Sequence, residues 1–463
     1  MPVALAAARL RLYVCVKRKS SYLQGEIAVK TIVPVPEDQV KLLAGFWRSR
    51  QELVRTEAIP YQWEALNDAI PDVEPSHAIQ NLRVAAGDAT GTHRGFVFQD
   101  SDVAKWLEAV GHILQQGRDP ALETKADSVI ELLERVQQAD GYLNSYYQVN
   151  KPDERWSNLR DDHELYCAGH LIEAAVAYSN ATGKDAILRV ARRLADHLWD
   201  RFGPAPEKIP GYSGHPEIEL ALTKLYAATQ ERRYLDLARF FVDERGRQPN
   251  FFIEEAKHRN DTRPYHPEYA QNHLPVREQD TAEGHAVRAM YLFSGAADVA
   301  CEFDDLSLKE ALTGLWDNVT QKRMYVTGGV GSSAWGEAFT LDYDLPGDRA
   351  YAETCAAIGL VFWGQRMLRL DGDGKYADVI ERALYNGVLS GMSFDAQRYF
   401  YVNPLEVWPE AAARRHDMHA VKVERQPWFG CACCPPNLSR LLASLSGYVY
   451  GMDPGGDGLF VHL

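Results

Sequence analysis

The chain has 463 residues, enough for two or three average domains or for one large helical domain. Its apolar content of 46% is ordinary for a globular protein, and its net charge of −14 without a long basic run argues against nucleic acid as a partner. No stretch reaches about 18 apolar residues, so we expect no transmembrane helix and no membrane partner.

The N-terminal segment and the distribution of cysteines both indicate the cellular compartment of the protein. The first 16 residues are apolar, but Arg9 and Arg11 interrupt them, which is not the pattern of a signal peptide. The seven cysteines are odd in number and unevenly spread: Cys15, Cys167, Cys301, Cys355, Cys431, Cys433 and Cys434. This set does not indicate a disulfide framework, and we therefore expect a reducing compartment, the cytoplasm.

In chain order, residues 1–36 alternate loosely between apolar and polar side chains, which predicts an N-terminal β segment of one or two strands. From about Val40 the pattern becomes helical. Apolar residues recurring at three and four predict helices over 41–67 (one helix, or two broken near Pro60), 103–116, 121–138, 166–182, 185–198, 217–229, 233–242, 281–299, 306–319, 353–370, 375–392 and 434–449. Residues 451–463 are typical of a turn and a strand, which we expect to begin an incomplete β domain.

These helices form pairs. A long apolar helix is followed by a short turn and a more polar helix, most clearly over 167–198 and 217–242. Repeated helical hairpins bury their apolar faces against neighbours, in an open solenoid or a closed ring. Because the spacing varies and the loops between hairpins are long, we favour a closed α/α ring of six hairpins over residues 37–450. The long loops would gather at one end of the inner helices, where we expect a site.

Three cysteines fall within the four residues 431–434, directly before Pro435 and Pro436. Proline suits the first turn of a helix, so Cys433 and Cys434 are predicted at or just before a helix N-terminus. Such a position stabilises a thiolate, which is the form that binds a metal or acts as a nucleophile. Adjacent cysteines rarely bridge each other. A metal-binding or reactive cluster is therefore favoured over buried cysteines without a role.

A second group, Glu353 and Cys355, lies two residues apart at the start of a predicted helix. Together with Cys433 and Cys434 they form a Cys3Glu set, whose soft thiolates and count of four suit Zn²⁺. The alternative is that Glu353 is a carboxylate at a helix N-terminus and Cys355 a core residue. The 80-residue gap between the two groups leaves both interpretations open.

The glycine-rich segment 325–337 ends in Glu337. It lacks the Gly-Lys-Ser/Thr ending and the flanking strand of a phosphate-binding loop, so we exclude that function. We expect the loop to hold Glu337 at the mouth of a cavity near Trp335 and Phe339, where apolar surroundings would raise its pKa and suit a general acid. A solvent-facing glutamate is the alternative.

Several histidines stand near predicted helix starts: His163, His170, His215 and His285. None has metal-ligand spacing to another, except weakly His163 with His170. A single histidine is more often a structural residue than a ligand. Three at similar points of successive hairpins, however, would line one end of a ring, where neutral imidazoles suit the hydroxyl groups of a sugar.

Taken together, these motifs resemble glycoside hydrolase family 127, a β-L-arabinofuranosidase family long described as a domain of unknown function. The pair Glu353-Thr-Cys and Cys433-Cys-Pro-Pro-Asn is rare and therefore specific. The other matching stretches follow in order: Ile59-Pro-Tyr-Gln-Trp-Glu, Asp140-Gly-Tyr-Leu, His163-Glu-Leu-Tyr-Cys-Ala-Gly-His, Gly214-His-Pro-Glu-Ile-Glu-Leu-Ala-Leu, Gly328-Gly-Val-Gly, Gly336-Glu-Ala-Phe and Phe400-Tyr-Val-Asn-Pro-Leu.

The resemblance implies a mainly α protein: an (α/α)6 barrel catalytic domain over residues 37–450, with the N-terminal β segment of residues 1–36 and the truncated start of a C-terminal β-sandwich over 451–463. It implies zinc held by Glu353, Cys355, Cys433 and Cys434. It also implies a retaining release of terminal β-L-arabinofuranose, with Cys433 as the zinc-bound nucleophile and Glu337 as the acid/base. The implied sugar-contacting residues are Gln62, His163, His215, His285 and Tyr401.

We expect an oligosaccharide or glycoside as substrate, and a homodimer is compatible with this interpretation. Family members usually continue into β domains that are missing here, which puts full activity in question. Two alternatives stay open. One is a non-catalytic barrel whose zinc is only structural, which predicts a closed metal site. The other is an α/α-barrel enzyme acting on another sugar or on a uronate, which needs a second carboxylate or a basic patch across the pocket.

Overall fold

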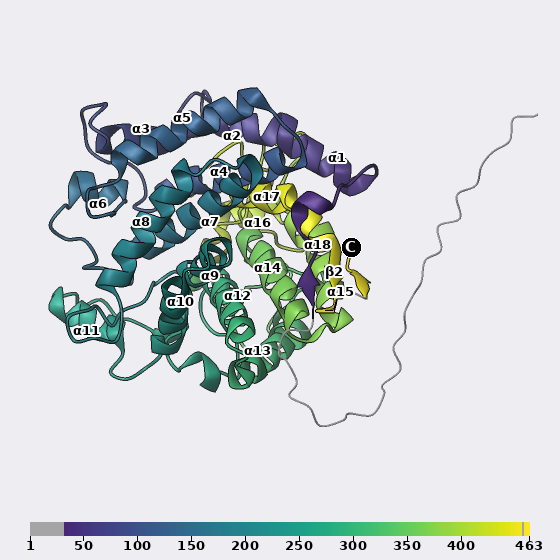
Figure 1. Ribbon diagram of the computed structural model, residues 1–463. Helices are drawn as coiled ribbons and strands as arrows, with labels where there is room; N and C mark the ends of the chain where they lie inside the picture. The colour runs from purple at the N-terminus through teal and green to yellow at the C-terminus, as the bar shows by residue number, and fades with distance from the viewer. Residues whose placement is uncertain (1–31, 456–457) are drawn as a thin grey trace, which may run out of the picture.

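The computed structural model describes residues 32–455 and 458–463. Six long helices form a closed ring around one axis, and each packs against the next before the last returns to the first (Figure 1). In ring order these inner helices are α4 (Asp100–Gln116), α7 (Glu164–Thr182), α9 (Ile218–Thr229), α12 (Ala286–Glu302), α14 (Thr354–Asp371) and α17 (Cys434–Ala443).

Outside this ring lies a second layer of helices, each following its inner partner in the chain: α5 (Pro120–Val136), α8 (Ala186–Arg201), α10 (Arg232–Glu244), α13 (Leu306–Asn318) and α15 (Gly374–Arg382). The outer partner of α17 comes from the other end of the described chain, as α1 (Phe46–Leu53) and α2 (Ile59–Leu66), joined by the π-helical turn Val54–Ala58. The predicted ring of six hairpins is therefore confirmed, and its sixth hairpin joins the two ends of the barrel sequence.

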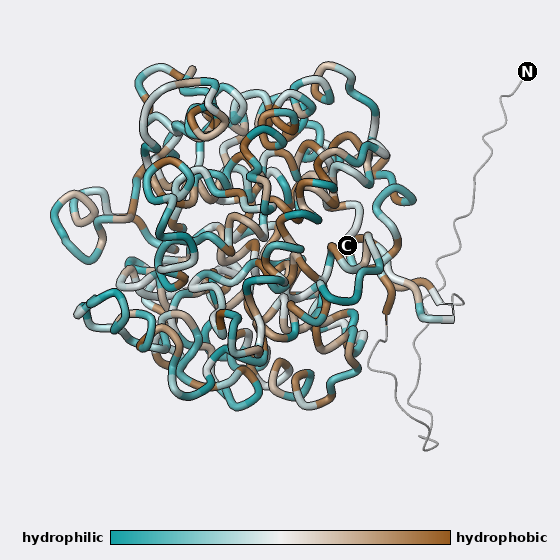
Figure 2. Tube along the Cα trace, turned by 60° about the vertical axis from the view of Figure 1, so that its left-hand side comes forward, coloured by the Kyte–Doolittle hydropathy of each residue, from teal (hydrophilic) through white to brown (hydrophobic). Residues whose placement is uncertain are grey.

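The burial pattern explains the two layers. In α7 nearly every residue from Glu164 to Tyr178 is buried, whereas α8 buries one stripe that includes Ile187, Val190, Leu194 and Leu198. A helix that is apolar all round must lie inside, and an amphipathic one covers it. One hydrophobic core contains residues from all six inner helices, and Figure 2 shows the hydrophilic segments mainly around its outside.

Several short elements were not predicted: α3 (Ala78–Ala85), α6 (Ser145–Asn150), α11 (Phe251–His258) and α16 (Pro409–Arg414), all within the connections between hairpins. The predicted helix over 434–449 is split into α17 and α18 (Ser446–Val449). The start of α12 was also misplaced. It begins at Ala286 rather than Thr281, because His285 is an extended N-cap whose ring Nδ1 accepts a hydrogen bond from the Val287 amide at 3.2 Å.

A small antiparallel sheet joins the two ends of the described chain. Its strands β1 (Val33–Pro34), β2 (Tyr450–Met452) and β3 (Leu459–Val461) lie in that order, with Val33 opposite Met452 and Tyr450 opposite Val461. Residues 1–31 of the predicted N-terminal β segment lie outside the described residues, so the division at residues 36 and 450 stays a prediction. Among the described helices, none is both long and apolar enough to cross a membrane.

Candidate active site

The N-termini of the inner helices meet at one end of the barrel, because every hairpin returns the chain to the same end. Functional residue types occupy these termini: His163 is the N-cap of α7, His285 of α12, Glu353 of α14 and Cys433 of α17. A cavity of about 750 Å³ lies here, lined by all four of these side chains. Helix N-termini favour negative charge, so this end suits thiolates and carboxylates.

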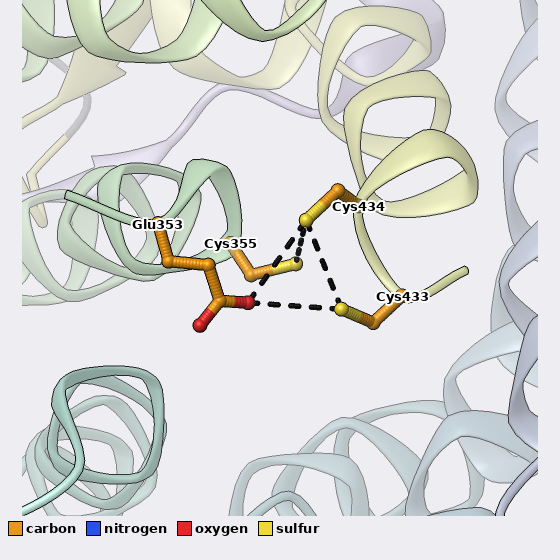
Figure 3. Close-up of side chains that lie close together, drawn as sticks. All are labelled: Glu353, Cys355, Cys433 and Cys434. Carbon is orange, nitrogen blue, oxygen red and sulfur yellow. Dashed lines mark hydrogen bonds between the residues drawn. The ribbon is translucent and has the colours of Figure 1, made fainter. Parts of the chain in front are cut away.

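Glu353, Cys355, Cys433 and Cys434 form one compact group at this end, which we call the mouth cluster (Figure 3). The Cys433 sulfur lies 3.6 Å from the Glu353 Oε1 and 3.7 Å from the Cys434 sulfur, which in turn lies 3.4 Å from the Cys355 sulfur. All four donor atoms lie within 4.8 Å of one another, so the group could hold a metal ion. The fold thus brings together the two predicted pairs.

The protonation of the mouth cluster reflects crowding of negative groups. Burial and the nearby Glu337 carboxylate raise the pKa of Glu353 well above its usual range. Burial and hydrogen bonds with the two other thiols likewise raise the pKa of Cys434. Burial also acts on Cys355, but hydrogen bonds from Cys433 and Cys434 outweigh it and lower the pKa to about 7. Without a cation, the four groups cannot all ionise together.

Glu337 lies on a tight turn that also carries Trp335. Gly336 and Glu337 both have positive φ, at 67° and 52°, and the Glu337 side chain lines the cavity. Its Oε2 lies 3.0 Å from the His285 Nε2. Burial opposes ionisation, but His285, Glu353 and Tyr351 donate to the carboxylate and lower its pKa to about 2. The predicted raised pKa of Glu337 is therefore wrong in this state of the protein.

The three predicted histidines lie side by side along the cavity wall. The His215 ring centre is 5.7 Å from that of His163 and 5.7 Å from that of His285. Burial and then the Arg288 charge lower the pKa of His163 to about 3 and that of His215 well below its usual range, and burial lowers the pKa of His285, so all three are neutral at neutral pH.

The tautomers of these histidines follow from their partners. Nδ1 of His163 and Nδ1 of His215 each contact a backbone carbonyl, at 2.6 and 3.0 Å, so these atoms donate and the opposite Nε2 atoms can accept. In His285 the roles are reversed, because Nδ1 accepts from the backbone and Nε2 donates to Glu337. The wall therefore presents two acceptors to the cavity, which suit hydroxyl groups, while the donor of His285 is taken up by Glu337.

Tyr401 lines the cavity, with its hydroxyl 3.8 Å from the Cys431 sulfur, and its contact with a sugar stays a prediction. Gln62 does not line it. Its side chain is fully buried behind α17, where the amide nitrogen donates to the Pro435 carbonyl at 2.9 Å and to the Ser439 hydroxyl at 2.8 Å. Gln62 thus anchors the first turn of the helix that carries Cys433 and Cys434, and it has no free surface for a sugar.

Other lining residues were not singled out from the sequence. Arg288 follows His285 by three positions on the first turn of α12, so helical spacing could have identified it. Tyr351 lies two residues before Glu353, ahead of the helix, and its closeness in sequence to Glu353 could have identified it. Tyr269 and Phe429 come from connections between hairpins, and no local pattern marks them.

Comparison with known proteins places the chain in a family. The family model of the β-L-arabinofuranosidase GH127 catalytic domain matches residues 39–447. A non-reducing end β-L-arabinofuranosidase from Bifidobacterium longum subsp. longum is 44% identical over 447 residues, which covers 91% of this chain and 68% of that protein.

Two solved structures are similar over most of the chain. A GH127 β-L-arabinofuranosidase from Geobacillus stearothermophilus T6 is 59% identical with a TM-score of 0.90, covering 92% of this chain and 67% of its own. A GH127 β-arabinofuranosidase is 40% identical with a TM-score of 0.82, covering 94% of this chain and 65% of its own. The chain belongs to the GH127 family of β-L-arabinofuranosidases and is a glycosidase of that type.

Proposed function

We propose that this protein is a retaining glycosidase that releases terminal β-L-arabinofuranose from a glycoside or oligosaccharide, with Cys433 as nucleophile and Glu337 as acid/base. The observation that carries the proposal is one cavity that exposes a thiol at a helix N-terminus, a carboxylate on a loop and a row of neutral histidines. The family membership and the name of the Bifidobacterium relative support the choice of sugar.

Cys433 would act in the first step. Most retaining glycosidases use two carboxylates, one of which attacks the anomeric carbon. Here the sulfur of Cys433 would form that bond, while the carbon–oxygen bond to the leaving group breaks and its electron pair departs with the oxygen. The position at the N-terminus of α17 favours the thiolate needed for this attack.

Glu337 would handle the protons. It gives a proton to the leaving oxygen in the first step, and in the second it takes one from water, whose oxygen displaces the Cys433 sulfur. Two displacements at one carbon retain its configuration. A pKa of about 2 leaves Glu337 ionised, but as a weak base and a rarely protonated acid, so both steps need a higher pKa. Ionisation of the adjacent Glu353 would favour the protonated form needed for the first step, because like charges repel.

The mouth cluster fits zinc. Tetrahedral zinc, with bonds of about 2.3 Å to sulfur and about 2.0 Å to oxygen, sets sulfur–sulfur distances near 3.8 Å and sulfur–oxygen distances near 3.5 Å. The observed sulfur–sulfur distances are 3.4 and 3.7 Å, and the sulfur–oxygen distances are 3.6 and 3.9 Å. When bound by Glu353, Cys355, Cys433 and Cys434, zinc would keep the Cys433 thiol deprotonated at neutral pH.

A purely structural zinc is the competing interpretation. Such a site is closed on all sides by side chains. Cys433, however, is only half-buried and lines the cavity, as does Glu337, whereas Cys434 is completely buried. One ligand that faces a cavity containing a carboxylate supports a catalytic role over a structural one.

The test is hydrolysis of p-nitrophenyl β-L-arabinofuranoside by the full chain, with metal content and product anomer measured together. We expect retained configuration, one zinc per chain and loss of turnover in Cys433→Ala. Glu337→Gln should accumulate a pentosyl adduct on Cys433, detectable by peptide mass spectrometry, because the activated leaving group needs no acid but the second step needs a base.

Cys301→Ala is the matched control, since Cys301 is a buried core cysteine that does not line the cavity, and it should keep full turnover. Near wild-type turnover by Cys433→Ala, or an inverted product, would overturn the proposed mechanism.

A further inference from the structure

Six arginines among the described residues are buried, and they differ in whether a carboxylate accompanies them. Five form ion pairs at distances from 2.5 to 3.4 Å: Arg160 with Asp261, Arg245 with Glu219, Arg323 with Asp342, Arg366 with Asp298 and Arg440 with Glu173. The sixth is Arg288, which has no ion pair within the described part of the chain. Burying a charge without an opposite charge is costly, so the folded chain leaves this cost without an offset.

The guanidinium of Arg288 also has spare hydrogen-bond donors. Its Nη1 donates to the Gly214 carbonyl at 2.9 Å, and the guanidinium carbon lies 4.5 Å from the centre of the Tyr269 ring. The Nε atom is buried and finds no hydrogen-bond partner among the described residues. A guanidinium carries five N–H donors, so most of them are unused. Because Arg288 lines the cavity at the barrel mouth, a ligand in that cavity can supply the missing acceptor.

Three carboxylates line the same cavity, and each has another partner. Glu337 accepts from His285 at 3.0 Å, and Glu353 belongs to the mouth cluster. Glu74 accepts from a backbone amide at 3.0 Å. Ionised acids repel an anionic ligand, whereas a neutral hydroxyl group adds no charge and its oxygen accepts from a cationic donor. A sugar hydroxyl is therefore the partner that best suits Arg288.

The surroundings of Arg288 place a hydrogen-bond acceptor nearby. Gly214, whose carbonyl Arg288 holds, directly precedes His215, and the Nε2 of His215 is one of the two acceptors of the cavity wall. A hydroxyl group accepts and donates at the same time. One sugar hydroxyl can thus accept from the guanidinium and donate to the imidazole.

We propose that Arg288 is a specificity-determining residue, whose guanidinium donates to one hydroxyl oxygen of the arabinofuranose while that hydroxyl donates to Nε2 of His215. This inference rests on the proposed function, since it takes a neutral pentofuranose as the ligand of the cavity. It adds that the enzyme demands a hydroxyl group at one particular position of the sugar. A substrate without that hydroxyl leaves the buried cation without a partner, which a site built to bind the hydroxyl strongly disfavours.

The experiment measures kcat/KM on four substrates: p-nitrophenyl β-L-arabinofuranoside and its 2-deoxy, 3-deoxy and 5-deoxy analogues. Arg288→Gln keeps an N–H donor for the Gly214 carbonyl but removes the charge. We expect it to lower kcat/KM about 10- to 100-fold on the parent glycoside and on two analogues, and to leave the third analogue nearly unchanged, because that one lacks the hydroxyl that Arg288 binds. Each comparison uses one substrate, so differences in intrinsic reactivity cancel. Arg288→Lys keeps the charge and should recover part of the loss on the same three substrates.

Arg263→Met is the matched control, because Arg263 is an exposed cation that does not line this cavity, and it should leave kcat/KM unchanged on all four substrates. An equal loss on all four substrates in Arg288→Gln would overturn the inference, because Arg288 would then only hold the segment around Gly214 in place. An unchanged kcat/KM in Arg288→Gln would overturn it as well. Failure of the wild type to cleave the parent glycoside would instead count against the proposed function.

Discussion

Within the described residues, three groups of side chains have ligand atoms close enough to hold a metal ion. One of them, His285, Glu337 and Glu353, shares Glu353 with the mouth cluster, and the other two differ in how their charge is balanced. One is the mouth cluster. The other, the mid-barrel cluster, consists of Glu108, His170 and Glu173, halfway along α4 and α7. In the mid-barrel cluster the Arg440 Nη1 lies 2.9 Å from Glu108 and 2.6 Å from Glu173. Within the described residues, no lysine or arginine forms an ion pair with the mouth cluster.

Their pKa shifts run in opposite directions. In the mid-barrel cluster burial opposes ionisation, but the Arg440 and Lys224 charges outweigh it and lower the pKa of Glu108 and of Glu173. In the mouth cluster burial and neighbouring acids raise the pKa of Glu353. The mid-barrel carboxylates thus already have their cations, whereas the mouth cluster lacks one. Closeness of donor atoms therefore does not define a metal site unless positive charge is also missing.

Among the tests of this contrast between the two clusters, removal of the metal should have the largest effect. We expect a chelator, or Cys355→Ser, to lower kcat on the order of 10³-fold, because the proposed nucleophile loses the cation that ionises it. Zinc analysis and turnover should fall in parallel and recover together when zinc is returned to the chelated protein. Glu108→Gln is the matched control and should keep the zinc. Full turnover by the metal-free protein would show that the mouth cluster does not need a cation.

Arg440→Met tests the other cluster. It leaves two buried carboxylates with the half-exposed Lys224 as their remaining cation, so we expect a loss of about 3 kcal/mol in the free energy of unfolding, measured by urea denaturation. Removing the carboxylates as well, in Arg440→Met combined with Glu108→Gln and Glu173→Gln, should recover part of the loss. An unchanged unfolding midpoint in Arg440→Met would show that the mid-barrel cluster is not held by this arginine.

His285→Asn is expected to have an intermediate effect at the mouth. The ring of His285 caps α12 and donates to Glu337, so its loss should misplace the carboxylate and lower kcat by about 10- to 100-fold. The loss should be larger for an alkyl glycoside than for the p-nitrophenyl glycoside, because only the former needs a proton on its leaving oxygen. An equal loss on both would mean that His285 acts on the sugar rather than through Glu337.

The comparison also separates what the sequence predicts from what it does not. The two halves of the mouth cluster were predictable, because Cys433 and Cys434 directly precede two prolines and Glu353 and Cys355 flank a helix start. That the halves meet was left open by the sequence, because about 80 residues separate them. The ring of helices followed from the pairing of apolar and amphipathic segments. Both predictions rest on patterns of a few residues.

The mid-barrel cluster was not predictable in this way. Glu108, Glu173 and Arg440 lie in three helices, and nothing local distinguishes them from surface charges. The same limit explains two errors at the mouth. Gln62 has the polarity of a sugar ligand, but its partners Pro435 and Ser439 are more than 370 positions away. The pKa of Glu337 depends on His285 and Glu353, which arrive from other hairpins.

Two histidines give the smallest predicted effects, and they act at opposite ends of the pH range. At the mouth, burial and Arg288 lower the pKa of His163 to about 3. Beside the mid-barrel cluster, burial disfavours the charged His112, but Glu37 at 2.7 Å and Glu108 at 3.7 Å outweigh it and raise its pKa to about 9. An unfolded histidine titrates near 6.5.

The sign of each contribution follows. Stability from neutral His163 is complete above pH 6.5 and declines as the pH falls toward 3, since the unfolded chain then binds the extra proton. Stability from charged His112 is complete below pH 6.5 and declines as the pH rises through 9. The loss of stability relative to pH 6.5 is at most about 2 kcal/mol, for His163 at pH 5 and for His112 at pH 8, and it is smaller where the ring still contacts water.

We would measure the free energy of unfolding by urea denaturation at pH 5, 6.5 and 8. His163→Asn should flatten only the acid side of this pH profile, and His112→Asn only the alkaline side. A histidine without an acidic partner and one with two acidic partners must respond to protons in opposite ways. If both variants flattened the same side of the pH profile, the mouth and the mid-barrel region would therefore not differ in charge balance.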